Sequence, residues 1–398
     1  MKRLILLVID SLGVGYMDDV AEVRPQDIGA NTFKHILDNA VDFNIPTLEL
    51  LGINNILNHP KLKKTTPVAS YGTMNLQHQG ADSYAGHQEI MGTYPKAPNI
   101  APFKEYIQEV KNALEQRGYK TIIPDPTQPY IKVEDHIVIA DNIETDYGQI
   151  YNLTAALDHI SFEKVLEIAN IVRQIVKVNR VIALGGEAIT IKDIENSIET
   201  RKDGLTGVNS PKSGVYKKGY NVRHIGYGVN PNTQISTILT ENNKEVTLIG
   251  KMQDVITCEK ATKKPAVETQ LVMELILKAM KTTKEGLIAA TVQETDLAGH
   301  SQDPQKYAEI IMIIDKHLKT IIEKMTTQDT LIITADHGND PTIGHSQHTR
   351  EKTPLLLYNK NTKPQNLGTR KTLSDIAATI AHIFNTAPPE HGTPFQNH

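Results

Sequence analysis

A mostly apolar run that ends in an Asp-His pair is the strongest constraint on how this chain folds. Residues 331–335 read Leu-Ile-Ile-Thr-Ala, a composition typical of a strand buried on both faces, and Asp336 and His337 follow directly. A turn rich in Gly, Asn and Pro comes next, and His348 lies twelve residues after Asp336. The pattern predicts metal ligands at the end of a strand. Carboxylate oxygen beside imidazole nitrogen suits Mn, Zn or Fe better than Mg or Ca.

Two further apolar runs lead to acidic and histidine side chains. Residues 4–9 run directly into Asp10, and residues 286–292 are followed by Asp296 and His300. Open α/β sheets place their ligands at the carboxyl ends of parallel strands, so we expect three strand ends to converge. A single histidine would more often be an ordinary core or surface side chain. The joint pattern favours a shared site with enough ligands for two divalent ions.

The segment that begins Asp82-Ser83 predicts the start of a helix. Gly86 follows and carries no side chain, so the first turn of this helix could approach a ligand closely. An Asp-Ser pair is more often only a helix cap, and the residues alone leave both interpretations open.

Other helices are predicted by spacing and by capping residues. Residues 162–177 and 266–280 carry apolar side chains three and four positions apart, and Leu271, Met273 and Leu275 are expected on the buried side of the second helix. Asp303 and Pro304 predict the N-cap and first turn of a long helix.

Length and local composition indicate two domains. The chain has 398 residues, more than a single domain usually holds. An α/β pattern occupies residues 1–97 and 228–398, and residues 98–227 are expected to form an inserted α+β domain with polar, basic loops. Arg201, Lys202, Asp203 and Lys212 are its best candidates for binding an anion, although such side chains are usually solvated surface.

Composition excludes several classes of protein. The formal net charge is -4 and no long Lys/Arg block occurs, so a dedicated nucleic-acid surface is not expected. No apolar run approaches the roughly 20 residues of a membrane helix. The single cysteine, Cys258, rules out an intrachain disulfide and is expected to be an inert thiol, which fits the cytoplasm.

Four motifs together resemble the alkaline-phosphatase superfamily, and within it the phosphopentomutase family. The cofactor-independent phosphoglycerate mutases are more distantly similar. The likeness covers nearly the whole chain, and its motifs are Asp10, Asp82-Ser83-x-x-Gly86-His87, Asp296-x-x-Gly-His300 and Asp336-His337-Gly-Asn-Asp-Pro-Thr…His348-Thr-Arg350-Glu351.

The resemblance implies a fold and a set of site residues. The fold would be an α/β three-layer core with an inserted α+β cap, and the active site would lie in the cleft between them. One ion, expected to be Mn, would bind Asp10, Ser83, Asp336 and His337, and a second would bind Asp296, His300 and His348. Arg201, Lys202 and Asp203, together with Lys251, would hold the distal phosphate of a small sugar phosphate.

The resemblance also implies a reaction. Ser83 would be the nucleophile and carry a phosphoryl group, and the enzyme would interconvert ribose or deoxyribose 1-phosphate and 5-phosphate.

The chain departs from the phosphopentomutase pattern at three places. Ser83 stands where that family usually has Thr, the spacing from Asp296 to His300 is four rather than five, and residues 151–156 lack an evident Asp that would contact ribose. These departures leave open a mutase, phosphohydrolase or lyase that acts on another phosphorylated or phosphonylated metabolite. A non-catalytic metal-binding or scaffold protein is a further alternative.

Overall fold

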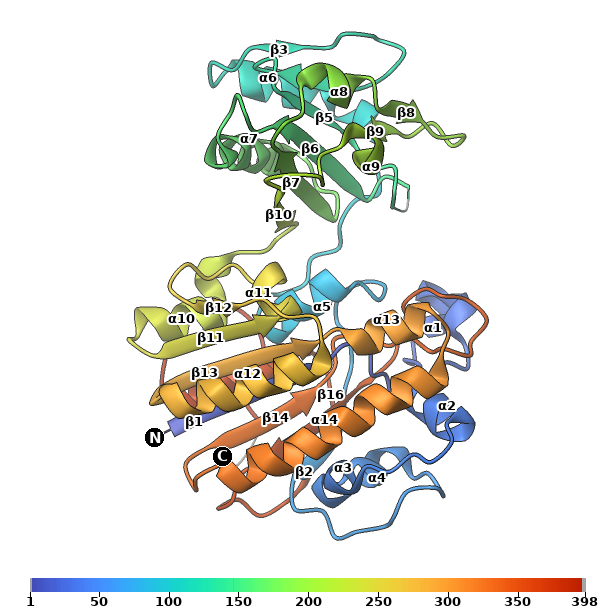
Figure 1. Cartoon of the computed structure of the whole chain (residues 1–398), viewed down its shortest axis with the longest axis vertical. Coiled ribbons are helices and arrows are strands. Elements are labelled where there is room, and N and C mark those ends of the chain that lie inside the picture. Colours follow the sequence, from blue (N-terminus) through green and yellow to red (C-terminus); the bar gives the residue numbers. More distant parts are fainter. Residues whose placement is uncertain (1, 146, 396–398) are drawn as a thin grey trace. The chain divides into compact units, whose positions relative to one another are not determined.

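The structure is a computed structural model that describes residues 2–145 and 147–395 (Figure 1). The chain forms two compact units. The first comprises Met1–Pro95 and Asn230–His398, and the second comprises Lys96–Val229.

The first unit is built on an eight-stranded sheet. Its strand order is β12-β11-β13-β1-β14-β15-β2-β16, with β11, β13, β1 and β14 parallel to one another and β15 antiparallel to both of its neighbours. The strands are β1 (Lys2–Ile9), β2 (Ser70–Met74), β11 (Glu245–Gly250), β12 (Thr262–Lys264), β13 (Glu285–Val292), β14 (Thr330–Thr334), β15 (Thr353–Tyr358) and β16 (Asn366–Arg370).

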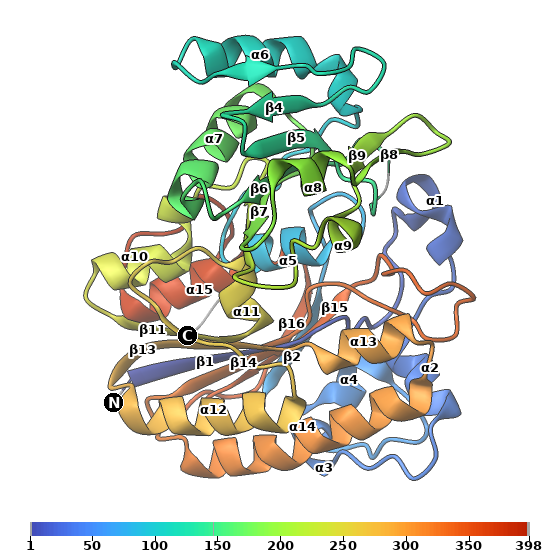
Figure 2. The same cartoon turned by 45° about the horizontal axis from the view of Figure 1, so that its top comes forward.

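Helices cover both faces of this sheet, which gives the first unit three layers (Figures 1 and 2). Helices α2, α3, α12 and α14 pack on one face, and α5, α10, α11 and α15 on the other. The helices of this unit are α1 (Val20–Val23), α2 (Thr32–Asn39), α3 (Pro46–Leu51), α4 (Ile53–Leu57), α5 (Ser83–Ile90), α10 (Ile235–Glu241), α11 (Lys251–Val255), α12 (Thr269–Thr282), α13 (Glu294–His300), α14 (Pro304–Lys324) and α15 (Asp375–Phe384), with short 3-10 helices at Pro25–Asp27 and Pro231–Thr233.

The continuous apolar run of β1 follows from this layering. Ile5, Leu7 and Ile9 belong to the core under α12 and α14, whereas the alternate residues, Leu4 among them, belong to the core under α15. A strand buried on both faces has no solvent side and therefore no polar alternation.

The second unit contains a six-stranded sheet of order β10-β7-β6-β5-β4-β3 and a small β8-β9 sheet. Helices α6 and α7 pack on one face of the larger sheet and α8 on the other. Its elements are β3 (Thr121–Ile122), β4 (Ile131–Val133), β5 (Ile137–Asp141), β6 (Ile150–Ala156), β7 (Arg180–Gly186), β8 (Ile198–Thr200), β9 (Thr206–Val208), β10 (Asn221–Gly226), α6 (Ile107–Glu115), α7 (Phe162–Ile175), α8 (Ile191–Glu195) and α9 (Ser210–Ser213), with a 3-10 helix at Phe103–Glu105.

The parallel strands of the first unit place the predicted ligands together, just beyond the carboxyl ends of neighbouring strands. Ile9 of β1 pairs with Val292 of β13, and Val8 pairs with Thr334 of β14, so these three strands end side by side. The segments that follow them carry the predicted acidic and histidine residues. Across the described residues, no helix has the length and apolar character needed to span a bilayer.

Candidate metal centre

The first ligand set combines residues that follow β1 and β14. Asp10, Asp336 and His337 each offer one ligand atom, and these atoms lie within 4.8 Å of one another. His337 Nε2 is 3.5 Å from Asp10 Oδ1 and 3.3 Å from Asp336 Oδ2. All three side chains are fully buried. Two carboxylates and an imidazole whose ligand atoms converge form a donor set suited to a divalent transition metal.

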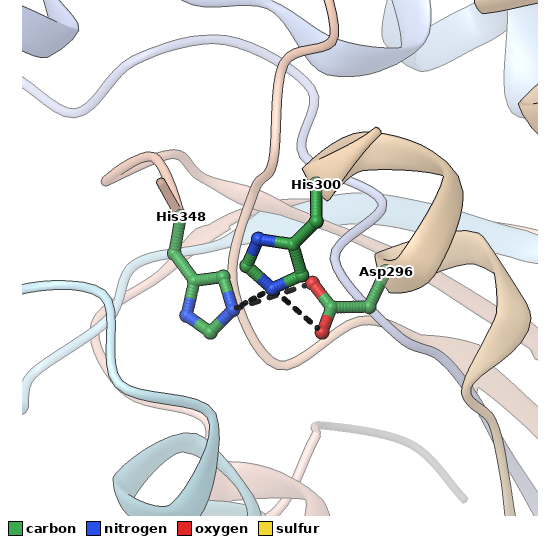
Figure 3. A group of neighbouring side chains, drawn as sticks. All are labelled: Asp296, His300 and His348. Atoms are coloured by element: carbon green, nitrogen blue, oxygen red, sulfur yellow. Dashed lines mark hydrogen bonds and ion pairs between the residues drawn. The ribbon is translucent and has the colours of Figure 1, made fainter. Parts of the chain in front are cut away.

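The second ligand set joins helix α13 to the loop that contains His348 (Figure 3). His300 Nε2 lies 3.3 Å from Asp296 Oδ2, and His348 Nε2 lies 3.3 Å from Asp296 Oδ1. The two Nε2 atoms are 3.1 Å apart. Asp296 and His300 are four residues apart on one helix, so both side chains extend from the same face.

The imidazoles of His300, His337 and His348 share one hydrogen-bonding pattern, in which Nδ1 contacts a backbone carbonyl oxygen and Nε2 stays available for a metal ion. The Nδ1 atom of each lies within hydrogen-bond distance of a backbone carbonyl oxygen: 2.8 Å for His337 and Gly338, 2.9 Å for His348 and Ala81, and 2.7 Å for His300 and Ser346. A carbonyl oxygen only accepts, so the proton of each neutral imidazole resides on Nδ1. Nε2 is then left with a lone pair directed into the site, which is the arrangement of metal-ligating histidines.

Two buried polar atoms in the first set have no hydrogen-bond partner among the described residues. They are Asp10 Oδ1 and His337 Nε2. Leaving such atoms unsatisfied is costly, and native proteins rarely do so. A divalent ion bound between them would satisfy both atoms, so the residues fit a metal.

Ser83, the predicted nucleophile, lies next to the first ligand set. It is the first residue of α5, whose N-cap is Asp82, and the Asp82 side chain accepts a hydrogen bond of 2.8 Å from the Ala85 backbone N–H. Ser83 Oγ donates a 2.6 Å hydrogen bond to Asp336 Oδ2. The Asp-Ser pair is therefore a helix cap and, at the same time, places a hydroxyl group against a candidate metal ligand.

Gly86 allows α5 to approach Asp336. A Cβ atom at this position would lie 2.6 Å from the Asp336 carbonyl oxygen and 3.0 Å from Asp336 Cβ. The missing side chain is thus a packing requirement for placing Ser83.

We expect Gly86→Ala to destabilise the protein by about 1–3 kcal/mol, because the added methyl group must push α5 away from Asp336. The displacement should also lower the reactivity of Ser83. Chemical denaturation measures the first effect and turnover measures the second. A variant with wild-type stability and turnover would contradict this account of the packing.

His87 is a site residue that the sequence reasoning missed. It is fully buried, with Nδ1 2.8 Å from the Ser83 carbonyl oxygen and 3.1 Å from Asp336 Oδ2, and with Nε2 2.8 Å from Thr291 Oγ1. Its spacing of four from Ser83 on a helix places both on one face, and that signal could have identified it. The ring contacts both the predicted nucleophile, Ser83, and the candidate ligand Asp336.

Lys251 lies among the candidate metal ligands. Its Nζ is 2.8 Å from Asp10 Oδ2 and 3.9 Å from Asp296 Oδ2. Burial disfavours the ammonium ion, but Asp10, Asp336 and Asp296 outweigh this effect and raise the pKa of Lys251. The ammonium form of Lys251 is therefore favoured by the carboxylates around it.

In the second ligand set, contacts between Asp296 and the histidines shift the pKa values of Asp296 and His300, and these shifts determine how strongly protons compete with a metal ion. Burial disfavours ionised Asp296, but the bonds from His300 and His348 outweigh it and lower the pKa of Asp296. The bond from Asp296 raises the pKa of His300 against the opposing effect of burial.

Metal affinity should consequently rise with pH through neutrality. The pKa of His300 lies above its ordinary value of about 6.5, so without metal the imidazolium form persists at pH values above 6.5. A ligand must lose this proton before it binds metal. Equilibrium dialysis with Mn²⁺ between about pH 6 and pH 8 should show affinity increasing with pH. Affinity that is constant over this range would exclude the assigned role of His300.

The predicted cap residues lie in the second unit. The Arg201 guanidinium donates to the carbonyl oxygens of Ile143 and Thr145, and it pairs with Asp203 at 2.5 Å. Lys202 is exposed on the same turn. Residues 151–156, where the sequence departs from the phosphopentomutase pattern, form β6 and are buried throughout.

Comparisons with known proteins show the family to which this chain belongs. The model of the metalloenzyme superfamily matches residues 2–388. A phosphopentomutase from Caldanaerobacter subterraneus subsp. tengcongensis is 31% identical over 420 residues, covering 99% of this chain and 97% of the relative. The crystal structure of a phosphoglycerate mutase from Leishmania mexicana, determined at low cobalt concentration, superposes with a TM-score of 0.52 at 10% identity, covering 99% of this chain and 97% of that one. The latter likeness concerns the fold alone.

Proposed function

Because this chain belongs to the metalloenzyme superfamily, we propose that it is a metal-dependent phosphomutase whose substrates are ribose or deoxyribose 1-phosphate and 5-phosphate. The pentose assignment is supported by the full-length phosphopentomutase relative. The proposal includes a cytoplasmic location. No nucleic acid or membrane takes part.

One observation carries the proposal. The Ser83 hydroxyl lies 2.6 Å from Asp336. Asp336 belongs to one of two adjoining ligand sets at the carboxyl ends of the parallel strands. A binding or scaffold protein has no need of a hydroxyl group at this point, whereas a phosphoryl-transfer enzyme needs a nucleophile there.

Two divalent ions, proposed to be Mn²⁺, would occupy the two sets. Asp10, Asp336 and His337 with Ser83 would hold one, and Asp296, His300 and His348 the other. When bound, these ions would lower the pKa of the serine hydroxyl and neutralise the oxygens of the transferring phosphoryl group.

The chain's own residues orient the reaction. Asp336 Oδ2 accepts a hydrogen bond from the Ser83 hydroxyl and fixes the direction of Oγ. His87 Nδ1 contacts both the Ser83 carbonyl oxygen and Asp336 Oδ2. The Lys251 ammonium group adds positive charge where an anionic phosphoryl group has to enter a cluster of carboxylates. Phosphorylated Ser83 would give its phosphoryl group to one hydroxyl of the sugar phosphate and recover one from the other oxygen.

We further propose that the second unit acts as a cap on the substrate. Residues 98–227 would form this cap, and Arg201, Lys202 and Asp203 would contact the distal phosphate. Lys251 is proposed to act at the metal centre instead, because it contacts Asp10.

Phosphorus NMR of the protein with Mn²⁺ and ribose 5-phosphate tests the function. The expected result is ribose 1-phosphate, formed in the presence of catalytic bisphosphate and without accumulation of inorganic phosphate. Release of inorganic phosphate without isomerisation would identify a phosphohydrolase and overturn the mutase proposal.

A further inference from the structure

Glu351 is a buried carboxylate that the reaction itself does not use. It is fully buried, lies two residues before the start of β15 and accepts four hydrogen bonds. Oε2 accepts from the backbone N–H groups of Gly15 at 3.1 Å and Thr32 at 2.9 Å. Oε1 accepts from the hydroxyl groups of Thr32 at 2.6 Å and Thr349 at 2.7 Å.

All four partners donate toward Glu351. Two are backbone N–H groups. The Thr32 hydroxyl already accepts from the Asn339 backbone N–H at 3.1 Å, and the Thr349 hydroxyl from the Asp340 backbone N–H at 3.2 Å, so both hydroxyl protons are directed at the carboxylate. An amide at position 351 would set its own N–H₂ group against donors. Burial raises the pKa of Glu351, and the four hydrogen bonds act in the opposite direction.

The segments that meet on Glu351 carry the first ligand set. Gly13 and Gly15 belong to the loop that follows Asp10, and Gly338 follows His337 directly. A Cβ atom on Gly13 would lie 2.3 Å from Glu351 Oε2, and one on Gly338 would lie 2.4 Å from Oε1. The backbones of both ligand-bearing loops therefore pack directly against this carboxylate.

The same network reaches the second ligand set through Asn339. Its backbone N–H binds the Thr32 hydroxyl that Glu351 holds, and its Nδ2 donates a 3.0 Å hydrogen bond to Asp296 Oδ1. Thr349 follows His348 directly, and it exchanges two backbone hydrogen bonds with Gly338. One carboxylate is thus connected to the segments of both ligand sets.

We propose that Glu351 is a positioning residue that sets the spacing of the two metal-ligand sets, acting through Thr32, Thr349 and Asn339. The inference rests on the proposed function in one respect, that both sets bind divalent ions. It predicts that neutralising Glu351 weakens metal binding although no atom of Glu351 would touch a metal.

The test compares Glu351→Gln with a matched control, Asp329→Asn. Asp329 is equally buried and multiply bonded, accepting from the backbone N–H and Nε of Arg3 and from Thr326. It precedes β14, at the opposite end of the strand from Asp336. Both variants should be less stable than wild type, so stability alone does not separate a positioning role from a structural one.

Equilibrium dialysis with Mn²⁺ separates the two roles. Glu351→Gln should lose about 10- to 100-fold in affinity, as substitutions behind metal ligands generally do. Asp329→Asn should remain within about twofold of wild type, since its bonds lie far along β14 from the ligands. Raising the Mn²⁺ concentration should restore part of the turnover of Glu351→Gln.

Three results are decisive. Wild-type protein that binds no Mn²⁺ would refute the metal part of the proposed function. Binding by wild type and equal affinity in Glu351→Gln would overturn the positioning role alone. If Glu351→Gln does not fold, Thr349→Val takes its place. It removes one of the four donors and should weaken Mn²⁺ binding, whereas wild-type affinity in that variant would overturn the proposal.

Discussion

Ser83→Ala is expected to lower mutase turnover by about 10⁴-fold or more, because the reaction loses its only proposed phosphoryl acceptor on the protein. The fold should be retained, since the hydroxyl makes a single described side-chain hydrogen bond, to Asp336. Turnover with ribose 5-phosphate and the melting temperature are the two measurements.

Ser83→Thr is the matched control for this prediction. Threonine keeps a hydroxyl group at the start of α5 and should retain substantial turnover. Activity above about a tenth of wild type in Ser83→Ala would exclude Ser83 as the nucleophile.

Asp336→Asn is expected to have the second largest effect. Asp336 accepts hydrogen bonds from the Ser11 backbone N–H at 3.1 Å and from Ser83 Oγ at 2.6 Å. Burial disfavours its ionised form, but His337 and His87 outweigh burial and hold the pKa of Asp336 well below its usual value. Asparagine keeps the shape, removes this charge and presents an N–H₂ group to donors.

The expected outcome is a drop from about two bound ions per chain to about one, with turnover reduced about 10³-fold or more. Asp296→Asn provides the comparison, because it should empty the second set and leave the first. Metal analysis after dialysis gives the stoichiometry. Two retained ions in Asp336→Asn would contradict the assignment of this ligand set.

The strands that carry the site could be predicted because they are buried on both faces. Residues 4–9 and 286–292 fall within β1 and β13; the first run is continuously apolar, and Thr291 is the polar residue in the second. The N-cap at Asp303 was equally predictable, since its side chain accepts from the Lys306 backbone N–H at 2.9 Å and Pro304 opens α14. In each case the decisive interactions are local in sequence.

Other elements carry no such local signal. Strands β2 and β16 lie toward one edge of the sheet and were not predicted, and β16 has a register irregularity between Asn366 and Gly368. Such strands need little hydrophobic patterning.

The expected apolar side of α12 was partly wrong, because Leu271 is exposed while Val272, Met273 and Ile276 are buried. The helix is rotated relative to the prediction by its contacts with α14 and the sheet.

The candidate site shows the same division. Strand ends placed Asp10 and Asp336 together, and the short spacing placed Asp296 with His300. The roles of His87, Asn339 and Glu351 depend on contacts between segments hundreds of residues apart, such as Glu351 with Gly15. No pattern within one segment could reveal the roles of Asn339 and Glu351, whereas the spacing of four between Ser83 and His87 could have identified His87.

Peptide mapping by mass spectrometry tests the central claim most directly. The protein would be incubated with Mn²⁺ and a pentose bisphosphate, quenched and digested. The account predicts one phosphoryl group per chain, located on Ser83 and removed by addition of ribose 5-phosphate. Isomerisation without phosphorylation of Ser83, or a transferable phosphoryl group on another residue, would contradict it.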